Sequence, residues 1–262
     1  MVPRCVAIIP CRGGSKRVPR KNIRAMLGEP LLVHIARAAL ACAEVDDVYF
    51  ATDDDDIAAA AAIALGGRPD RVVRVPTALA GDDCGVLPVL SLAWDRAVRD
   101  AVADQCEPRP KGTVDFRPPE LLCYLRATSP LVTALDVSNA VRALCAAPEA
   151  DSIVAVTPLT GAHPSRFKQI DAASGLLVDA FPDAFPEGAT PARSETLAAF
   201  GRSGAVSVLR PPSTIDVGSM WGTRVLPLVC DDESSVDINT QHEWDIAEFL
   251  LARRRQRAAA VR

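Results

Sequence analysis

The sequence predicts an α/β fold, in which helices cover both faces of a mostly parallel β-sheet. Short apolar runs rich in β-branched residues alternate with segments whose apolar residues follow helical spacing, and this alternation is typical of parallel sheets. Hydrophobic residues make up 49% of the 262 residues, which excludes a disordered chain and suffices for a large core. Because no internal repeat or linker is visible, we expect a single domain over residues 1–262 with an excursion at about 160–200.

The first half of the chain is predicted to alternate between strands and helices. Pro30 suits a first helical turn, and the carboxylates of Asp53–Asp56 suit the positive start of the next helix, which Gly66-Gly67 ends. The predicted elements are strand 5–10, helix 31–43, strand 48–52, helix 53–65, strand 71–75 and helix 87–102.

The second half continues the pattern after a Pro-rich and charged loop at 105–119. Residues 181–193 combine prolines with Gly188 and charges, so we expect a loop or arm over an active site. The predicted elements are strand 121–127, a turn at Ser129-Pro130, helix 136–146, strand 152–157, strands 204–209 and 225–229, and helix 240–260.

Composition narrows the possible classes of function. The 29 basic and 33 acidic residues give a net charge of −4, which argues against nucleic acid as the main partner. No apolar run approaches a membrane span, and the N-terminus lacks the pattern of a secretory signal. The eight cysteines and three histidines are scattered without a Cys-x-x-Cys pair. We therefore expect reduced thiols, no structural zinc, no membrane partner and a cytoplasmic location.

The stretch from Ile8 to Asn22 is the most informative part of the sequence. A predicted strand leads directly into a loop with Gly13, Gly14 and several basic residues, a composition that can cradle a phosphate chain. A solvated basic loop is the alternative. The loop matches neither G-x-G-x-x-G nor G-x-x-x-x-G-K-[ST], which disfavours a dehydrogenase and a P-loop ATPase.

This stretch resembles the N-terminal signature of the acylneuraminate (CMP-sialic acid) cytidylyltransferase family, whose members transfer CMP from CTP to an acid. The resemblance implies a Rossmann-like fold with a small dimerisation or lid excursion, and so a homodimer. Further matches follow in the family's order: Thr52-Asp53-Asp54, Pro76–Asp82, Thr128-Ser129-Pro130, His163-Pro164, Trp221-Gly222 and Ser235-Val236-Asp237-Ile238-Asn239-Thr240.

The resemblance also implies roles for single residues. Asp237 would bind Mg²⁺, although on its own it also suits the start of the helix at Thr240. Lys21 would hold the α-phosphate region. The catalytic residues would be Arg12, Lys16 and Lys21. The nucleotide-binding residues would be Arg12, Gly13, Gly14, Ser15, Lys16, Asn22 and Arg74.

Several positions depart from the family's pattern. Asn239 replaces a second metal-binding Asp, which leaves the number of metal ions open. Val75-Pro76 replaces an Arg-Pro whose Arg helps to read the cytosine. Arg74 is one residue away and would point to the opposite face of a strand unless a bulge turns it. Other departures are Gly85 and Val86 in place of serines, Arg126 in place of a Gln, and Phe200 and Ser203-Gly204 in place of a Tyr and an Asn-Gly.

Arg126 bears most directly on the acceptor. A guanidinium at the end of a central strand suits a carboxylate or a phosphonate, because it binds either in a bidentate manner. Arg166, Lys168, Arg193 and Arg202 could add to the same pocket, and four or five basic groups exceed what a sialic acid with one carboxylate requires. A small phosphonate is therefore a second candidate acceptor beside a sialic-type sugar acid. The alternative is that the basic residues of this region pair with acidic ones such as Asp171, Asp179, Asp183 or Glu195. The predicted acceptor-binding set is Arg126, Arg166, Lys168, Arg193 and Phe200, with Arg202 as a further candidate.

The predicted function is that of a Mg²⁺-dependent cytidylyltransferase. CTP and an acid acceptor would give a CMP-conjugate and pyrophosphate, through attack on the α-phosphorus and charge neutralisation of the leaving group. Asn239 and Val75 leave a second interpretation open, a nucleotide-binding or regulatory homologue with impaired catalysis. The intact loop from Arg12 to Asn22 favours the interpretation as an active enzyme over the regulatory one.

Overall fold

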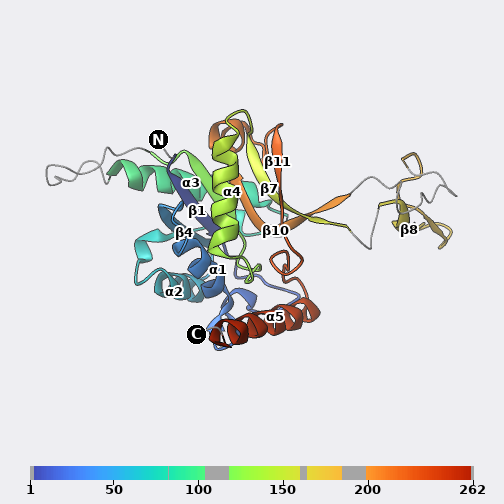
Figure 1. Ribbon diagram of the computed structural model, residues 1–262, viewed down its shortest axis with the longest axis horizontal. Helices are drawn as coiled ribbons and strands as arrows, with labels where there is room; N and C mark the ends of the chain where they lie inside the picture. The colour runs from blue at the N-terminus through green and yellow to red at the C-terminus, as the bar shows by residue number, and fades with distance from the viewer. Residues whose placement is uncertain (1–2, 82, 104–117, 160–163, 185–198, 261–262) are drawn as a thin grey trace.

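A computed structural model describes residues 3–81, 83–103, 118–159, 164–184 and 199–260 and confirms the α/β fold (Figure 1). Its main sheet has seven strands in the order β11-β7-β10-β6-β1-β4-β5. Strand β10 runs antiparallel to both of its neighbours, and the other pairs are parallel. The strands are β1 (Cys5–Pro10), β4 (Asp47–Thr52), β5 (Val72–Arg74), β6 (Leu121–Leu125), β7 (Ser152–Pro158), β10 (Phe200–Leu209) and β11 (Val225–Val229).

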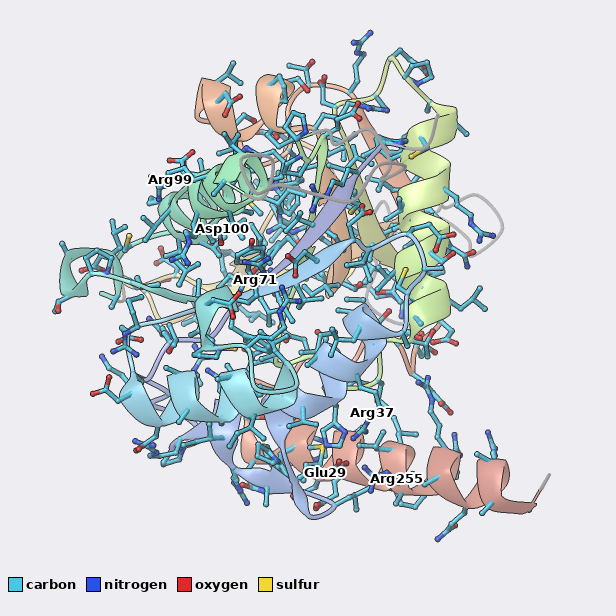
Figure 2. The ribbon with its side chains drawn as sticks, turned by 90° about the vertical axis from the view of Figure 1, so that its left-hand side faces the viewer. Glu29, Arg37, Arg71, Arg99, Asp100 and Arg255 are labelled. Atoms are coloured by element: carbon cyan, nitrogen blue, oxygen red, sulfur yellow. The ribbon has the colours of Figure 1, made fainter. Side chains whose placement is uncertain are left out.

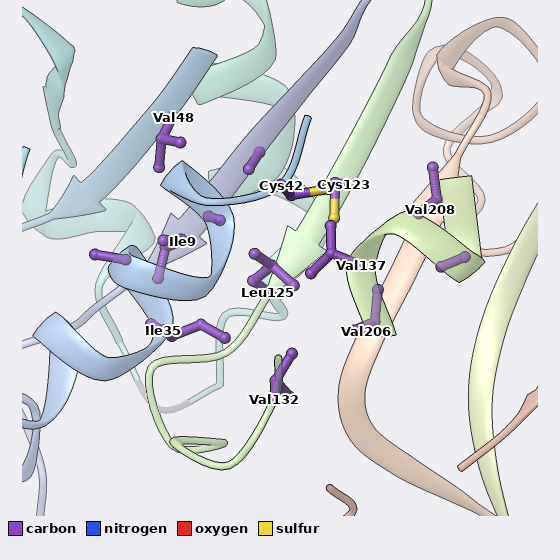
Figure 3. Close-up of a cluster of buried hydrophobic side chains, with 14 of the residues drawn as sticks. Ile9, Ile35, Cys42, Val48, Cys123, Leu125, Val132, Val137, Val206 and Val208 are labelled. Carbon is purple, nitrogen blue, oxygen red and sulfur yellow. The ribbon is translucent and has the colours of Figure 1, made fainter. Parts of the chain in front are cut away.

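Helices cover both faces of this sheet, as the sequence predicts. On one face, Ile9 of β1 and Leu125 of β6 contact a cluster that includes Ile35 and Val137 from two helices (Figure 3). On the other face, Ile8 packs with Trp94. Successive strand residues point to opposite faces, so β1 contributes to both cores. The helices are α1 (Leu31–Leu40), α2 (Asp55–Ala64), α3 (Val86–Ala103), α4 (Ala134–Ala146) and α5 (Gln241–Ala260).

The ends of several elements differ from the predicted ones. Helix α1 ends at Leu40 rather than 43, because the chain tightens into a turn in which the Cys42 N–H donates to the Ala39 carbonyl. Asp54 lies outside α2 and caps it, accepting from the Ile57 N–H at 2.9 Å. Strand β10 begins at Phe200 rather than 204, with a register shift between Arg202 and Ser207. The short strand pair β2 (Ala25–Met26) and β3 (Glu29–Pro30) was not predicted.

Helix α5 is docked against the segment that follows the basic loop. Trp244 of α5 packs with Val18, Met26 and Leu31 in a small core of its own. Glu29 forms ion pairs with Arg37 of α1 and with Arg255 of α5, at 2.5 Å and 2.6 Å (Figure 2). These contacts hold the chain just before α5 beside the loop after β1.

The excursion contains a second, separate sheet. Strands β8 (Lys168–Ile170) and β9 (Leu177–Asp179) pair as an antiparallel hairpin, which was not predicted, and in Figure 1 the hairpin lies well apart from the main sheet. The predicted loop over the site, at 181–193, extends past residue 184 and so lies mostly outside the described residues.

Two further expectations concern the cysteines and the helices. The cysteines within the described part of the chain are free thiols. Among the helices described, none has the length and apolar character that a membrane crossing needs.

Candidate functional site

A cavity of about 620 Å³ opens at the carboxyl ends of β1, β4 and β6, where α/β sheets bind their ligands. The basic loop forms one wall, the ends of β6 and of the 235–240 segment form another, and a mostly apolar wall follows β5. The charged and polar lining side chains include Arg12, Ser15, Lys16, Arg17, Lys21, Asn22, Arg126, Thr128 and Asn239. The apolar end is lined by residues such as Val75, Leu79, Ala80, Gly81, Cys84 and Gly85.

Gly13 joins the basic loop to the motif after β4. Its N–H donates to Asp53 Oδ1 at 2.9 Å, and a Cβ at this position would lie 2.8 Å from Asp54 Oδ2. A larger residue would therefore push the loop away from β4. A Cβ on Gly14, by contrast, would meet nothing within 4 Å. The structure thus gives Gly13 a packing role, and the backbone beside Gly14 is open to a ligand.

Lys21 and Asn22 are held by the loop and by the segment before α5. The buried Asn22 donates from Nδ2 to the Arg12 carbonyl at 2.9 Å and so fixes the shape of the loop. Lys21 Nζ donates to the carbonyl of Ile238. Burial lowers the pKa of Lys21, although Asp237 and Glu243 counteract this effect. Both residues line the cavity, as the sequence predicts.

Asp237 receives hydrogen bonds on both of its carboxylate oxygens. Thr128 Oγ1 donates to Oδ1, while Arg126 Nη1 at 3.3 Å and Asn239 Nδ2 at 3.2 Å donate to Oδ2. The alternative role at the start of α5 is filled by other residues. Thr240 and Glu243 cap that helix reciprocally, since each accepts a backbone N–H of the other. Asp237 therefore does not cap α5, and its three side-chain partners, Arg126, Thr128 and Asn239, line the cavity.

Arg126 is surrounded by partners from this chain. Its Nε donates to the hydroxyl of Tyr124 at 3.2 Å, and its side chain remains 34% exposed to the cavity. Gly204 of β10 makes room for the pair with Asp237, because a Cβ there would lie 3.0 Å from Arg126 Nη1 and 3.2 Å from Asp237 Cγ. The anion that the sequence predicts opposite Arg126 is thus present already, as Asp237.

The donors in this corner suit a metal ion that shares its ligands with a substrate. Asp237 offers one carboxylate and Asn239 one amide oxygen, and Mg²⁺ is commonly held by one or two carboxylates together with substrate phosphates and water. No group of three or more His, Cys, Asp or Glu residues suited to a metal occurs among the described residues. The pair therefore fits Mg²⁺ brought by a triphosphate better than a permanently bound ion.

Several predicted residues do not line the cavity. Arg74 turns toward the start of α2, where it contacts the Asp54 carbonyl at 3.1 Å and Asp55 Oδ1 at 2.7 Å, and no bulge brings it back. Lys168 pairs with Asp179 inside the β8–β9 hairpin. Arg166 and Phe200 are exposed, and the guanidinium of Arg202 lies 5.1 Å from the Trp221 ring centroid. Arg193 and His163 lie outside the described residues.

Other site residues were not assigned from the sequence. Tyr124, Thr52 and Asp53 line the cavity, and Gly204 shapes it from behind. The sequence could have indicated the first three, because they lie near the ends of predicted strands.

The Trp221-Gly222 match has a structural role instead. Gly222 has φ +73°, and a Cβ there would lie 2.4 Å from Asp151 Cβ, whose carboxylate accepts the N–H groups of Thr223 and Arg224 at 2.8 Å.

Comparison with known proteins agrees with this geometry. Residues 6–78, which include the basic loop, match the family described as "Cytidylyltransferase". The chain is 26% identical over 253 residues to the CMP-N,N'-diacetyllegionaminic acid synthase of Legionella pneumophila, covering 95% of this chain and 96% of that protein. It is 25% identical to the N-acylneuraminate cytidylyltransferase A of Danio rerio, over 94% of this chain and 50% of that protein.

Solved structures show the same fold. A CMP:2-keto-3-deoxy-manno-octonic acid synthetase complexed with CTP superposes with a TM-score of 0.60 at 19% identity, covering 96% of this chain and 99% of that one. A 4-diphosphocytidyl-2C-methyl-D-erythritol synthase from Anaerococcus prevotii gives a TM-score of 0.56 at 13% identity, covering 95% and 96%. These findings confirm the Rossmann-like fold and the predicted resemblance to cytidylyltransferases. The chain is an enzyme of the nucleotidyltransferase class.

Proposed function

We propose that this nucleotidyltransferase uses CTP and transfers its CMP group to a sugar acid, with release of pyrophosphate. The observation that carries the proposal is the cavity that joins the basic loop to the corner formed by Arg126, Thr128 and Asn239. A nucleoside triphosphate that lies along the loop would present its α-phosphorus near that corner. The relatives named above act, by their names, on sugar acids related to sialic acid.

The proposed mechanism relies on placement and charge. A hydroxyl oxygen of the sugar acid would attack the α-phosphorus and lose its proton to water, and the bond from that phosphorus to the β-phosphate oxygen would break. Arg12 and Lys16 would hold the leaving pyrophosphate, while Lys21 would neutralise the charge that develops on the α-phosphate. Asn22 has an indirect role, because its bond to the Arg12 carbonyl keeps the loop in this shape.

Mg²⁺ is part of the proposal. Asp237 and Asn239 would hold it together with phosphate oxygens of the nucleotide, since Asn239 lines the cavity and its amide group contacts the Asp237 carboxylate. When bound, the ion would supply Lewis-acid charge neutralisation to the transferring phosphoryl group. The ligand set of one carboxylate and one amide favours a single ion.

A sugar acid is favoured over a small phosphonate as the acceptor. The argument for a phosphonate depends on several basic residues that gather in one pocket. Arg166 and Lys168 do not line the cavity, and the charge of Arg126 is balanced by Asp237. Among the predicted acceptor-binding residues that the structure describes, Arg126 alone lines the cavity, and one guanidinium with a paired charge suits the single carboxylate of a sugar acid better than a doubly charged phosphonate. The base would be recognised by groups of the apolar end, such as the backbone around Ala80 and Gly81, since Arg74 points away.

A homodimer assembled through the excursion is also proposed. The β8–β9 hairpin exposes Ile170 by 73% and Leu177 by 68%, and Phe167 and Phe181 form an exposed aromatic pair beside it. Such a gathering of apolar side chains on a protruding hairpin is typical of an association surface. A cytoplasmic location is proposed as well, and it is supported by the free thiols.

Pyrophosphate release from CTP tests the proposal across a panel of acids that includes sialic-type sugar acids and small phosphonates. We expect release with a sugar acid and Mg²⁺, and a CMP-conjugate of matching mass. Lys16→Ala serves as the impaired reference, and Arg68→Ala, in the turn after α2 where the half-exposed Arg68 pairs with Asp47, as the neutral one. CTP binding without turnover on any acid would instead identify a regulatory homologue.

A further inference from the structure

The contacts of Asp237 suggest an unusual relation between this site and its metal. Both carboxylate oxygens face hydrogen-bond donors, and one of these donors, Arg126, carries a full positive charge. Asn239, the other oxygen ligand of the corner, is neutral and uses its amide nitrogen to bond Asp237 Oδ2 at 3.2 Å. The trio of Asp237, Asn239 and Arg126 is formally neutral.

The pair between Arg126 and Asp237 is built into the fold. Arg126 Nε also donates to the Tyr124 hydroxyl at 3.2 Å. The guanidinium can therefore lose its contact between Nη1 and Asp237 and still be held in the site. Gly204 contributes the space that both side chains occupy, since any Cβ there would lie within 3.2 Å of each. Lys21 adds a second positive charge nearby, because its Nζ donates to the carbonyl of Ile238, the residue after Asp237.

We propose that Arg126 is a built-in cation of this site, which competes with the divalent metal for Asp237 and so makes metal binding depend on bound nucleotide. This inference rests on the proposed function, in which Asp237 is the charged ligand. A metal ion without nucleotide must displace Arg126 Nη1 from Asp237 Oδ2. It gains little from doing so, because the trio of Asp237, Asn239 and Arg126 has no net negative charge. A triphosphate supplies that charge and further oxygen ligands. The nucleotide-free protein should therefore bind divalent ions poorly, and Arg126 is a positioning residue of the metal site.

Binding of Mn²⁺, followed by the electron paramagnetic resonance of the free ion, tests this inference without measuring activity. In nucleotide-free protein, Arg126→Gln should tighten Mn²⁺ binding on the order of tenfold, as expected for removal of one charge-assisted contact. Arg126→Lys keeps the charge and should remain close to the wild type. Arg142→Gln removes an exposed charge that pairs with Glu44 and should change nothing. Adding Asp237→Asn to Arg126→Gln should abolish the gain.

The outcomes separate this inference from the proposed function. Equal Mn²⁺ affinity in the wild type and in Arg126→Gln would show that Arg126 does not compete with the metal. The proposed transfer of CMP is tested separately, by pyrophosphate release across the panel of acids. A gain that survives Asp237→Asn would also overturn the competition, because the ion would then bind elsewhere. Thermal unfolding of each variant verifies the fold. Arg126→Met, which is similar in length and uncharged, repeats the test if the Gln variant does not fold.

Discussion

Lys16 is the residue whose loss should be felt most directly in the chemical step. It lines the cavity from the basic loop, and in the proposed mechanism it holds the leaving pyrophosphate. Lys16→Ala should lower kcat on the order of 10²-fold, the usual cost of removing one group that stabilises transition-state charge. Steady-state rates of pyrophosphate release measure the effect. An unchanged kcat would remove the loop from the mechanism.

Asn239 is the residue that should set the metal requirement. Asn239→Asp adds a carboxylate beside Asp237 and removes the amide that now donates to it at 3.2 Å. The Mg²⁺ concentration at half-maximal rate should fall about tenfold, the effect of one charge-assisted interaction. Asp237→Ala should abolish the Mg²⁺-dependent rate. Full activity of that variant with Mg²⁺ would show that the metal is bound by other groups.

At the scale of elements, the loop before β11 depends on one glycine. Gly222 combines φ +73° with a Cβ position 2.4 Å from Asp151. Gly222→Ala should therefore lower the free energy of unfolding by about 2 kcal/mol or more. Gly67→Ala is the matched control, because Gly67 also has a positive φ, +85°, but open space around it. Urea unfolding measures the free energy of unfolding of both variants. Equal decreases would show that the positive φ accounts for the whole effect and that the contact with Asp151 contributes nothing.

The same loop predicts a dependence on pH. Backbone N–H groups of Arg224 and Thr223 donate to the Asp151 carboxylate and hold its pKa well below the usual value. A lowered folded-state pKa stabilises the protein above the unfolded-state pKa of about 3.9, and this stabilisation is lost as the pH falls below that value. Asp151→Asn should thus cost most near neutral pH and progressively less below about pH 4. A difference between the two unfolding curves that does not vary with pH would contradict this.

Most of the strands and helices are predictable from the sequence, but the contacts between residues of different elements are not. β1 is an uninterrupted apolar run, β4 has four apolar residues between Asp47 and Thr52, and Gly66-Gly67 ends α2 with the positive φ values that glycine allows. The β8–β9 hairpin was missed because its strands have three residues each and leave apolar side chains exposed. The contact of Arg126 with Asp237 joins positions 111 residues apart, so no local pattern indicates it. The residues of the basic loop were identifiable because they are contiguous.

At the scale of the whole molecule, the excursion should govern assembly. Ile170→Asp with Leu177→Asp places charges on the exposed face of the β8–β9 hairpin and should shift a dimer toward monomer. Sedimentation velocity over a range of protein concentrations measures the shift. Ile63→Asp, at a residue of α2 that is 77% exposed, is the control for an added surface charge. A wild type that stays monomeric, or equal effects of both changes, would rule out this surface.

The register between β7 and β10 has a consequence for how such a molecule diversifies. Pro158 and Phe200 are partners across the two strands, so the chain leaves and re-enters the sheet at neighbouring points. We therefore expect that changes in the length of the intervening segment leave the strand order of the main sheet unchanged. Because the cavity lies around the ends of β1, β4 and β6, on the other side of β10, we expect such changes to alter association of the chain more than the residues that line the cavity.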